Sequence, residues 1–128
     1  MYEQKINFFT EKEEEFVNLF RKIGTKRNVA IVLVFLANVP DASSHDIERG
    51  TDLRQPEVSY AIKYLTPLKW IRYRDISSDR KGRPVRQYSL AVPFNEIITL
   101  IEKEKKKEAN NQLGIIRELR NNLANVSG

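Results

Sequence analysis

An uninterrupted apolar run at Val29–Ala37 constrains the fold of this chain most. It fills the helix that we expect at Lys26–Asn38 and leaves that helix almost no polar face. Helices that are apolar on nearly every side are buried. The nine residues of the run reach about half of the length that a membrane span needs. We therefore expect a soluble protein with this helix at the centre of its core, ended by Pro40.

An amphipathic helix is expected before this run. Thr10 and Glu13 have the spacing of a capping box. Behind them Phe16, Leu19, Phe20 and Ile23 recur at helical spacing, and Gly24 follows as a stop signal. The 110 residues outside 69–86 carry equal numbers of basic and acidic side chains. We expect most of these charged side chains to lie on the solvated faces of helices.

Two shorter helices are expected after the run. The first extends from Asp46 to about Gly50, with Ser43 or Ser44 as its cap. The second begins at Gln55-Pro56, because proline is well tolerated in the first helical turn, and it ends near Tyr64–Pro67. The apolar positions of this second helix, which we expect to be buried, are Val58, Ala61, Ile62 and Leu65.

Two alternating segments then predict a β-hairpin. Residues Trp70–Ile76 and Val85–Val92 show the period of two that is typical of strands, and the turn-rich segment 77–84 joins them. A long helix is expected at Phe94–Leu123 in two parts, because Glu102–Gln112 holds only one apolar residue. The fold class is therefore mainly α with a small β-hairpin, that is, α+β.

The order of these elements is that of a winged helix-turn-helix with flanking N- and C-terminal helices. Residues 43–48 and 53–65 resemble the helix-turn-helix of MarR-, ArsR- and TrmB-like regulators of bacteria and archaea, with Val58-Ser59 and Ile62–Leu65 matching the recognition-helix pattern. Lys81-Gly82-Arg83-Pro84 and Tyr88-Ser89-Leu90 resemble the wing of archaeal members. The resemblance implies a homodimeric repressor or activator that reads a short inverted repeat in DNA.

The basic charge of the chain is concentrated in the expected hairpin. Residues 69–86 hold seven basic and two acidic side chains, a net charge of +5, which equals the net charge of the whole chain. Basic residues near phosphates release counterions, so this concentration indicates a polyanion contact. A solvated basic loop is the alternative when the segment is considered alone.

Candidate DNA contacts follow from this layout. The recognition helix would read bases, with Gln55 suited to adenine and Tyr60 to a thymine methyl, although either could have a purely structural role. The wing would hold the backbone or the adjacent minor groove. The candidate residues are Ser44, Arg54, Gln55, Ser59, Tyr60, Lys63, Arg72, Arg74, Arg80, Lys81, Arg83 and Arg86.

The C-terminal helix is expected to dimerise. Its distal apolar residues would be exposed in a monomer, and they lie about 21 Å beyond residue 101 at 1.5 Å per residue. We expect residues 1–93 to form the DNA-binding domain with its N-terminal helix, and residues 94–128 to form the dimerisation helix. The expected interface residues are Phe16, Phe20, Ile98, Ile101, Ile115, Ile116, Leu119 and Leu123.

Other functions find little support in the sequence. The chain has no cysteine, and its lone histidine, His45, is a poor metal site, so we expect no cofactor, no metal and no enzymatic activity. The N-terminus lacks the apolar run of a signal peptide, which favours a cytoplasmic protein without a membrane contact. An unknown small-molecule or protein effector stays open. The alternative function is a winged-helix protein-interaction module without specific DNA binding.

Overall fold

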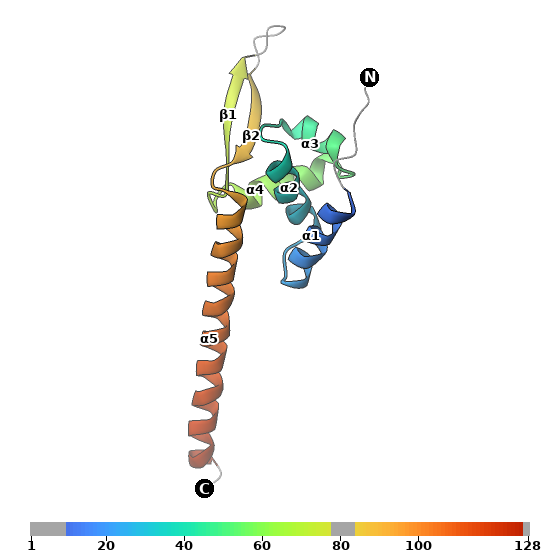
Figure 1. The fold of residues 1–128 in the computed structure, drawn as a ribbon. Coiled ribbons are helices and arrows are strands. Elements are labelled where there is room, and N and C mark those ends of the chain that lie inside the picture. Colours follow the sequence, from blue (N-terminus) through green and yellow to red (C-terminus); the bar gives the residue numbers. More distant parts are fainter. Residues whose placement is uncertain (1–9, 78–83, 127–128) are drawn as a thin grey trace. The chain divides into compact units, whose positions relative to one another are not determined.

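The computed structural model of the protein describes residues 10–77 and 84–126. The chain divides into two compact units, Met1–Pro93 and Phe94–Gly128, which are here called the N-terminal unit and the C-terminal helix. The order of elements confirms the expected α+β winged-helix fold (Figure 1). The elements are α1 (Glu11–Lys22), α2 (Arg27–Asn38), α3 (Ser44–Gly50), α4 (Gln55–Leu65), β1 (Ile71–Ser77), β2 (Pro84–Leu90) and α5 (Phe94–Val126).

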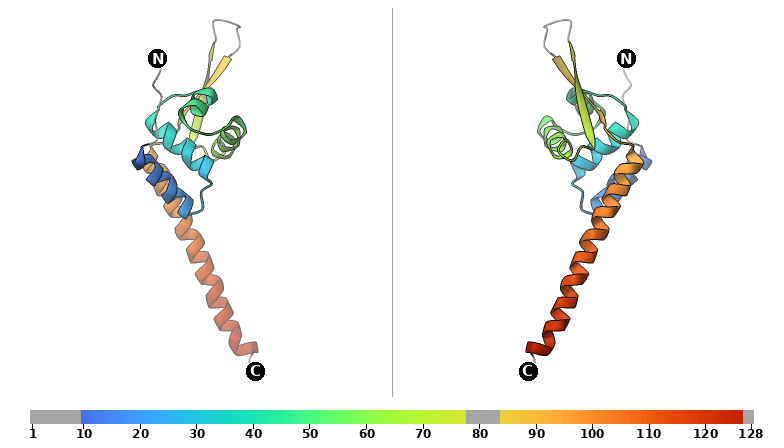
Figure 2. Two further views of the ribbon diagram at one scale, coloured as in Figure 1. Left: turned by 90° about the vertical axis from the view of Figure 1, so that its right-hand side faces the viewer. Right: turned by 90° about the vertical axis from the view of Figure 1, so that its left-hand side faces the viewer.

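Helix α2 is the centre of the N-terminal unit, as its composition predicts. Every residue from Val29 to Leu36 is buried. Helices α1 and α4 both pack against α2 (Figure 2). No polar or charged side chain is fully buried in the part of the chain that the structure describes, so the core is purely apolar.

Helix α1 begins and ends where its sequence signals predict. The backbone N–H of Thr10 donates to Glu13 Oε1 at 2.8 Å, and the pair forms the expected capping box. Gly24 ends the helix with φ 99°, which glycine tolerates without steric cost. The buried face differs in part from the periodicity, because Val17 and Phe20 are buried whereas Leu19 is 58% exposed. Only one edge of the predicted stripe therefore packs on α2.

Helices α3 and α4 form the helix-turn-helix. Ser43 is the N-cap of α3, and its hydroxyl accepts from the backbone N–H of Asp46 at 3.1 Å. Arg54 is the N-cap of α4, and Pro56 lies in the first turn. The side-chain amide of Asn28 donates to the carbonyl oxygen of Glu57 at 2.9 Å and so ties the start of α2 to α4.

Strands β1 and β2 form an antiparallel hairpin in which Tyr73 lies opposite Tyr88 and Asp75 lies opposite Arg86. The hairpin extends away from the helices of its own unit (Figure 2). An additional bridge that the sequence did not predict anchors its second strand. Tyr88 exchanges two backbone hydrogen bonds with Ala42, at 2.7 and 3.0 Å, so the segment before α3 holds β2 in place.

Helix α5 is one continuous helix rather than the expected helix in two parts. It extends over 33 residues and passes through Gly114 without interruption. At 1.5 Å per residue its length is about 50 Å. Ion pairs along the polar stretch, Lys106 with Glu102 and Lys105 with Glu108, have the helical spacings that support an exposed segment of this kind.

Candidate nucleic-acid interface

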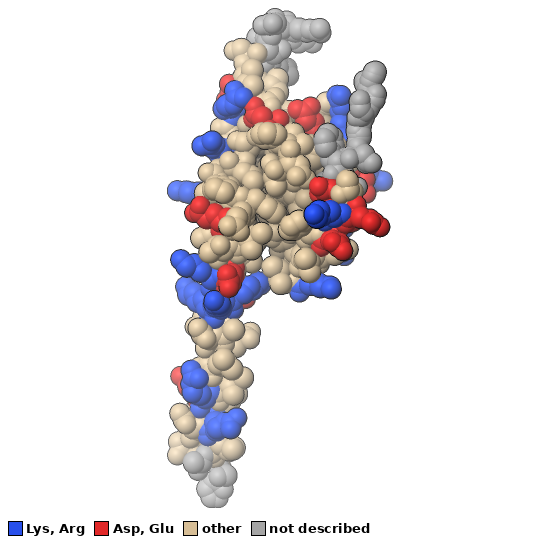
Figure 3. Space-filling view, viewed as in Figure 1, with Lys and Arg blue, Asp and Glu red and all other residues tan. Residues whose placement is uncertain are grey.

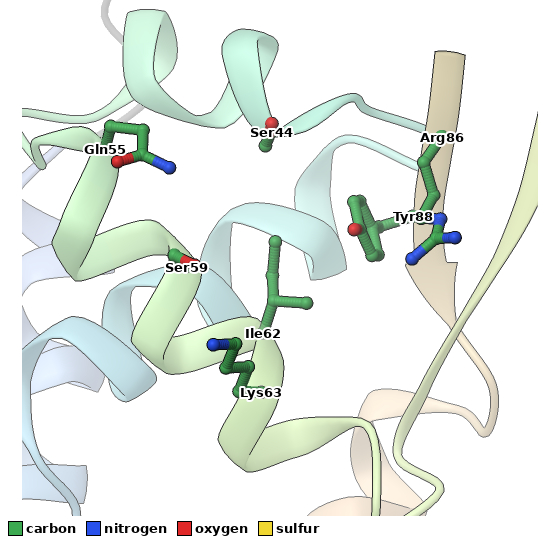
Figure 4. A pocket seen from close by; sticks show the side chains of 7 residues that line it. All are labelled: Ser44, Gln55, Ser59, Ile62, Lys63, Arg86 and Tyr88. Carbon is green, nitrogen blue, oxygen red and sulfur yellow. The ribbon is translucent and has the colours of Figure 1, made fainter. Parts of the chain in front are cut away.

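An open groove of about 270 Å³ lies between helix α4 and strand β2 of the N-terminal unit. Side chains of α4 form one wall, side chains of β2 form the other, and the start of α3 contributes the end (Figure 4). The lining is therefore assembled from the three elements of a helix-turn-helix and its wing. The residues that line this groove are Ser44, Gln55, Ser59, Ile62, Lys63, Arg86 and Tyr88.

Helix α4 presents hydrogen-bonding side chains to this groove. Gln55, Ser59 and Lys63 are spaced by four residues, so they follow one face of the helix. The opposite face, with Val58 and Ala61, is buried in the core. An amide, a hydroxyl and an ammonium group in a row can bond to base edges and to phosphate oxygens. Among the described residues, no ion pair neutralises Lys63.

Strand β2 presents an ordered guanidinium group to the same groove. Arg86 lies 4.0 Å from the centroid of the Tyr73 ring, and its Nε is 3.5 Å from Oδ1 of Asp75 on the neighbouring strand. Tyr88, whose ring is 6.0 Å from that of Tyr73, completes this face of the hairpin. Because the stacking and the carboxylate hold only part of the guanidinium, its remaining N–H groups stay available to an anion.

Residues 23–82 match the sequence model of the MarR family. The match includes α2, α3, α4 and β1, and so covers both the helix-turn-helix and the first strand of the wing. The match covers less than half of the chain, so residues 23–82 are similar to a MarR-family winged helix. The match supports a transcription regulator that binds DNA.

A solved structure agrees on the winged-helix fold. It is a possible transcriptional regulator from Methanosarcina mazei Go1, which is 18% identical to this chain. The alignment covers 82% of this chain and 87% of the other chain, with a TM-score of 0.66. Pex from a Synechococcus strain is a more distant match, with 20% identity over 71% of this chain and 96% of its own and a TM-score of 0.46. A comparison with curated proteins finds no match.

The hairpin places the predicted wing arginines on two different faces. Residues directly opposite in an antiparallel pair share a face, and alternate residues point to opposite faces. Arg86 therefore shares its face with Tyr73 and Asp75, while Arg72 and Arg74 point to the other face. Arg74 also forms an ion pair with Asp41, so its charge is partly compensated within the chain.

Tyr60 lies outside the groove although it belongs to the same helix. Its ring stacks on that of Tyr64 with 6.4 Å between centroids and 8° between planes. The ammonium group of Lys26, just before α2, lies 4.8 Å from the Tyr60 centroid. The tyrosine thus has structural neighbours, yet 45% of its surface is exposed.

Only some of the other predicted DNA contacts lie in the groove. Ser44 lines the groove, and Arg54, at the N-cap of α4, is exposed. Arg80, Lys81 and Arg83 lie outside the described residues. Sequence reasoning missed two lining residues: Ile62, which its apolar character placed in the core, and Tyr88, which only the bridge to Ala42 brings to the groove.

The expected interface residues fall into two groups by exposure. Phe20 is buried inside the N-terminal unit, since only 5% of its surface is exposed, so it presents little surface to a second subunit. The residues that are exposed in the single chain are Phe16, Ile98, Ile115, Ile116, Leu119 and Leu123, and Ile101 is partly exposed.

Acidic side chains gather at the first turn of α1, where Glu11, Glu13 and Glu14 interact favourably with the positive end of the helix dipole (Figure 3).

Within residues 10–77 and 84–126, no group of His, Cys, Asp and Glu side chains could hold a metal ion. No helix in these ranges is both long enough and apolar enough to cross a membrane.

Proposed function

We propose that the protein is a homodimeric transcription regulator that reads duplex DNA with α4 in the major groove and with the hairpin on the adjacent backbone or minor groove. The observation that carries this proposal is the groove between α4 and β2. Its two walls bring Gln55, Ser59 and Lys63 opposite Arg86. A strand of duplex DNA separates the major groove from the minor groove, so this spacing suits a backbone that passes between a recognition helix and its wing.

Each side chain of the groove has a defined role in this proposal. Gln55 lies in the first turn of α4 and can bond N6 and N7 of an adenine. Lys63 contacts guanine acceptors or a phosphate, and Ser59 bonds to either. Arg86 and Ser44 hold phosphate oxygens of the strand between the helix and the wing. The remaining basic residues of the wing, Arg72, Arg80, Lys81 and Arg83, add contacts that are independent of sequence.

Dimerisation rests on the apolar stripe of α5. Ile116, Leu119, Leu123 and Val126 follow one another at intervals of three, four and three residues, which is the spacing of a coiled-coil seam. Between 47% and 80% of the surface of each is exposed in the single chain. Regulators of the MarR family bind DNA and commonly act as dimers. A two-fold dimer would present two α4 helices to half-sites about one helical turn apart.

A salt titration of duplex binding tests the proposal. The fluorescence anisotropy of a labelled mixed-sequence duplex is measured with the purified chain over a range of salt concentrations. We expect binding to weaken steeply, with a slope of about −0.9 per phosphate contact. The triple variant Arg80→Glu, Lys81→Glu, Arg83→Glu should weaken binding to every duplex similarly. No salt-dependent binding by the wild-type chain would instead favour the protein-interaction module.

A selection of binding sites from random duplexes tests the recognition helix separately. Gln55→Ala should relax the preference at one position of the selected site and cost about 1–3 kcal/mol of binding free energy there. Ser89→Ala, a change in strand β2 outside the groove lining, is the control. If Gln55→Ala selects the wild-type site unchanged, α4 is not the element that reads the sequence.

A further inference from the structure

The surface beside α4 that faces away from the groove carries an aromatic and cationic cluster, formed by Lys26, Tyr60 and Tyr64. The two tyrosine rings are nearly parallel, with an angle of 8° between them. They belong to successive turns of α4, and 45% and 51% of their surfaces are exposed. The ammonium group of Lys26, the residue that precedes α2, lies 4.8 Å from the Tyr60 centroid.

Among the described residues, Lys26 has no carboxylate partner. No ion pair in these ranges engages it, whereas its neighbour Arg27 is paired with Asp52 at 3.5 Å. The Tyr60 ring holds the ammonium group by a cation–π contact, which does not satisfy its three N–H donors. The cluster therefore presents an ordered positive charge at the surface.

The position of this cluster around α4 relates it to the DNA-facing side. At 3.6 residues per turn, Lys63 lies between Ser59 and Tyr60, about 40° from the first and about 60° from the second. On one side of Lys63, Ser59 lines the groove to which Arg86 also belongs. On the other side, the ring of Tyr60 contacts the ammonium group of Lys26. The exposed face of α4 is thus bordered by a cation on both sides.

The dimensions of DNA can explain why a cation lies on each side of the exposed face of α4. A helix with its side chains is about 10–12 Å wide, and the major groove is about 12 Å wide, so an inserted helix has a phosphate strand along each side. The groove with Arg86 suits one strand. We propose that Lys26, held by Tyr60 and Tyr64, contacts a phosphate of the other strand. This inference rests on the proposed function and extends the DNA surface to the start of α2.

The replacement Lys26→Met tests this contact, because methionine keeps an unbranched apolar stem over Tyr60 and removes the charge. Binding to a mixed-sequence duplex is measured over a range of salt concentrations, together with the thermal unfolding midpoint of each variant. We expect the log–log salt slope of Lys26→Met to become shallower by about 0.9 for each phosphate that the variant no longer binds. Lys26→Arg keeps the charge and should keep the wild-type slope.

Two further variants make the result specific. Lys12→Met removes an exposed lysine of the same charge from the first turn of α1 and should leave the slope unchanged. Lys63→Met removes a cation from α4 itself and should make the slope shallower. Failure of the proposed function would appear as a wild-type chain with no salt-dependent duplex binding.

The inference alone would be overturned if the wild-type chain and Lys26→Met had the same slope while Lys63→Met had a shallower one. A lower unfolding midpoint for Lys26→Met without a change in slope would show that the cluster has only a structural role. That result would also overturn the inferred phosphate contact. A change in sedimentation without a change in slope would identify the cluster as a protein contact, which is also incompatible with a phosphate contact.

Discussion

Helices α2 and α5 are both rich in aliphatic residues, but they use them in opposite ways. The aliphatic residues of α2 are continuous, and eight successive residues are buried within the single chain. Those at the end of α5 are spaced along a stripe, and Leu119 is 67% exposed. The comparison shows that the arrangement of apolar residues, rather than their number, separates a helix that its own domain buries from one that leaves its apolar side chains exposed in the single chain.

The same change made in each helix should therefore have very different effects. Leu33→Ala removes a fully buried side chain from the core and should lower the free energy of unfolding by about 2–5 kcal/mol. Leu119→Ala, the matched change in α5, should alter the stability of the N-terminal unit by about 0.5 kcal/mol or less. Urea unfolding followed by tryptophan fluorescence measures both. Equal effects would contradict the distinction between the two helices.

Disruption of the α5 stripe should affect assembly and DNA binding while the core stays folded. The double variant Ile116→Asp, Leu119→Asp places two charges on the proposed seam and should give a folded monomer. Separation from the second DNA-binding unit should weaken operator binding about 100-fold, since linked sites gain at least that much from their effective concentration. Sedimentation and anisotropy measure the two effects.

The matched control for this variant is Asn110→Asp, Asn111→Asp, which adds the same charge to an exposed polar stretch of α5. We expect it to keep the dimer. A wild-type chain that is monomeric at the concentrations where it binds DNA would contradict the dimer altogether.

Gly114 allows a finer test of how α5 pairs. In the single chain, a Cβ atom added at this position would meet no atom within 4 Å apart from the adjacent residues and the backbone of its own helix. Gly114→Ala should therefore stabilise the helix by about 1 kcal/mol, because alanine is the better helix former. Circular dichroism at increasing temperature measures the gain. A decrease in stability that depends on protein concentration would instead show that a partner helix approaches the chain at Gly114.

The fold was largely predictable because its signals are local. The apolar run of α2, the capping box at Thr10 and the alternation of the hairpin each act within a few residues. The continuity of α5 was not predicted, because Gly114 and the polar stretch before it weaken the helix pattern, yet the i,i+3 and i,i+4 ion pairs that support it were readable from Glu102, Lys105 and Lys106.

The candidate site was less predictable because it depends on contacts between distant segments. The α4 side chains of the groove follow from helical spacing, but the place of Tyr88 depends on its bridge to Ala42. The hairpin register puts Arg86 on one face and Arg72 and Arg74 on the other, and the ion pair of Arg74 with Asp41 joins residues 33 positions apart. No short pattern contains such information.

The smallest predicted effect concerns the N-terminal unit alone and depends on pH. Hydrogen bonds from the hydroxyl and backbone N–H of Thr10, with a further bond from Asn38, hold the pKa of Glu13 below its ordinary value of 4.5. Because the folded state lowers this pKa, ionised Glu13 stabilises the fold fully above pH 4.5, and the stabilisation disappears as the pH falls through the lowered pKa.

The replacement Glu13→Gln keeps the capping-box geometry and removes the titrating group. Its thermal midpoint should lie below that of the wild type at neutral pH, and the difference should shrink at acid pH as the wild-type carboxylate becomes protonated. Glu15→Gln, an exposed position on the same helix outside the capping box, should show a difference that varies less with pH. Since Glu13 joins α1 to Asn38 of α2, we expect neither variant to change the proposed dimerisation through α5, and an effect on sedimentation would contradict this expectation.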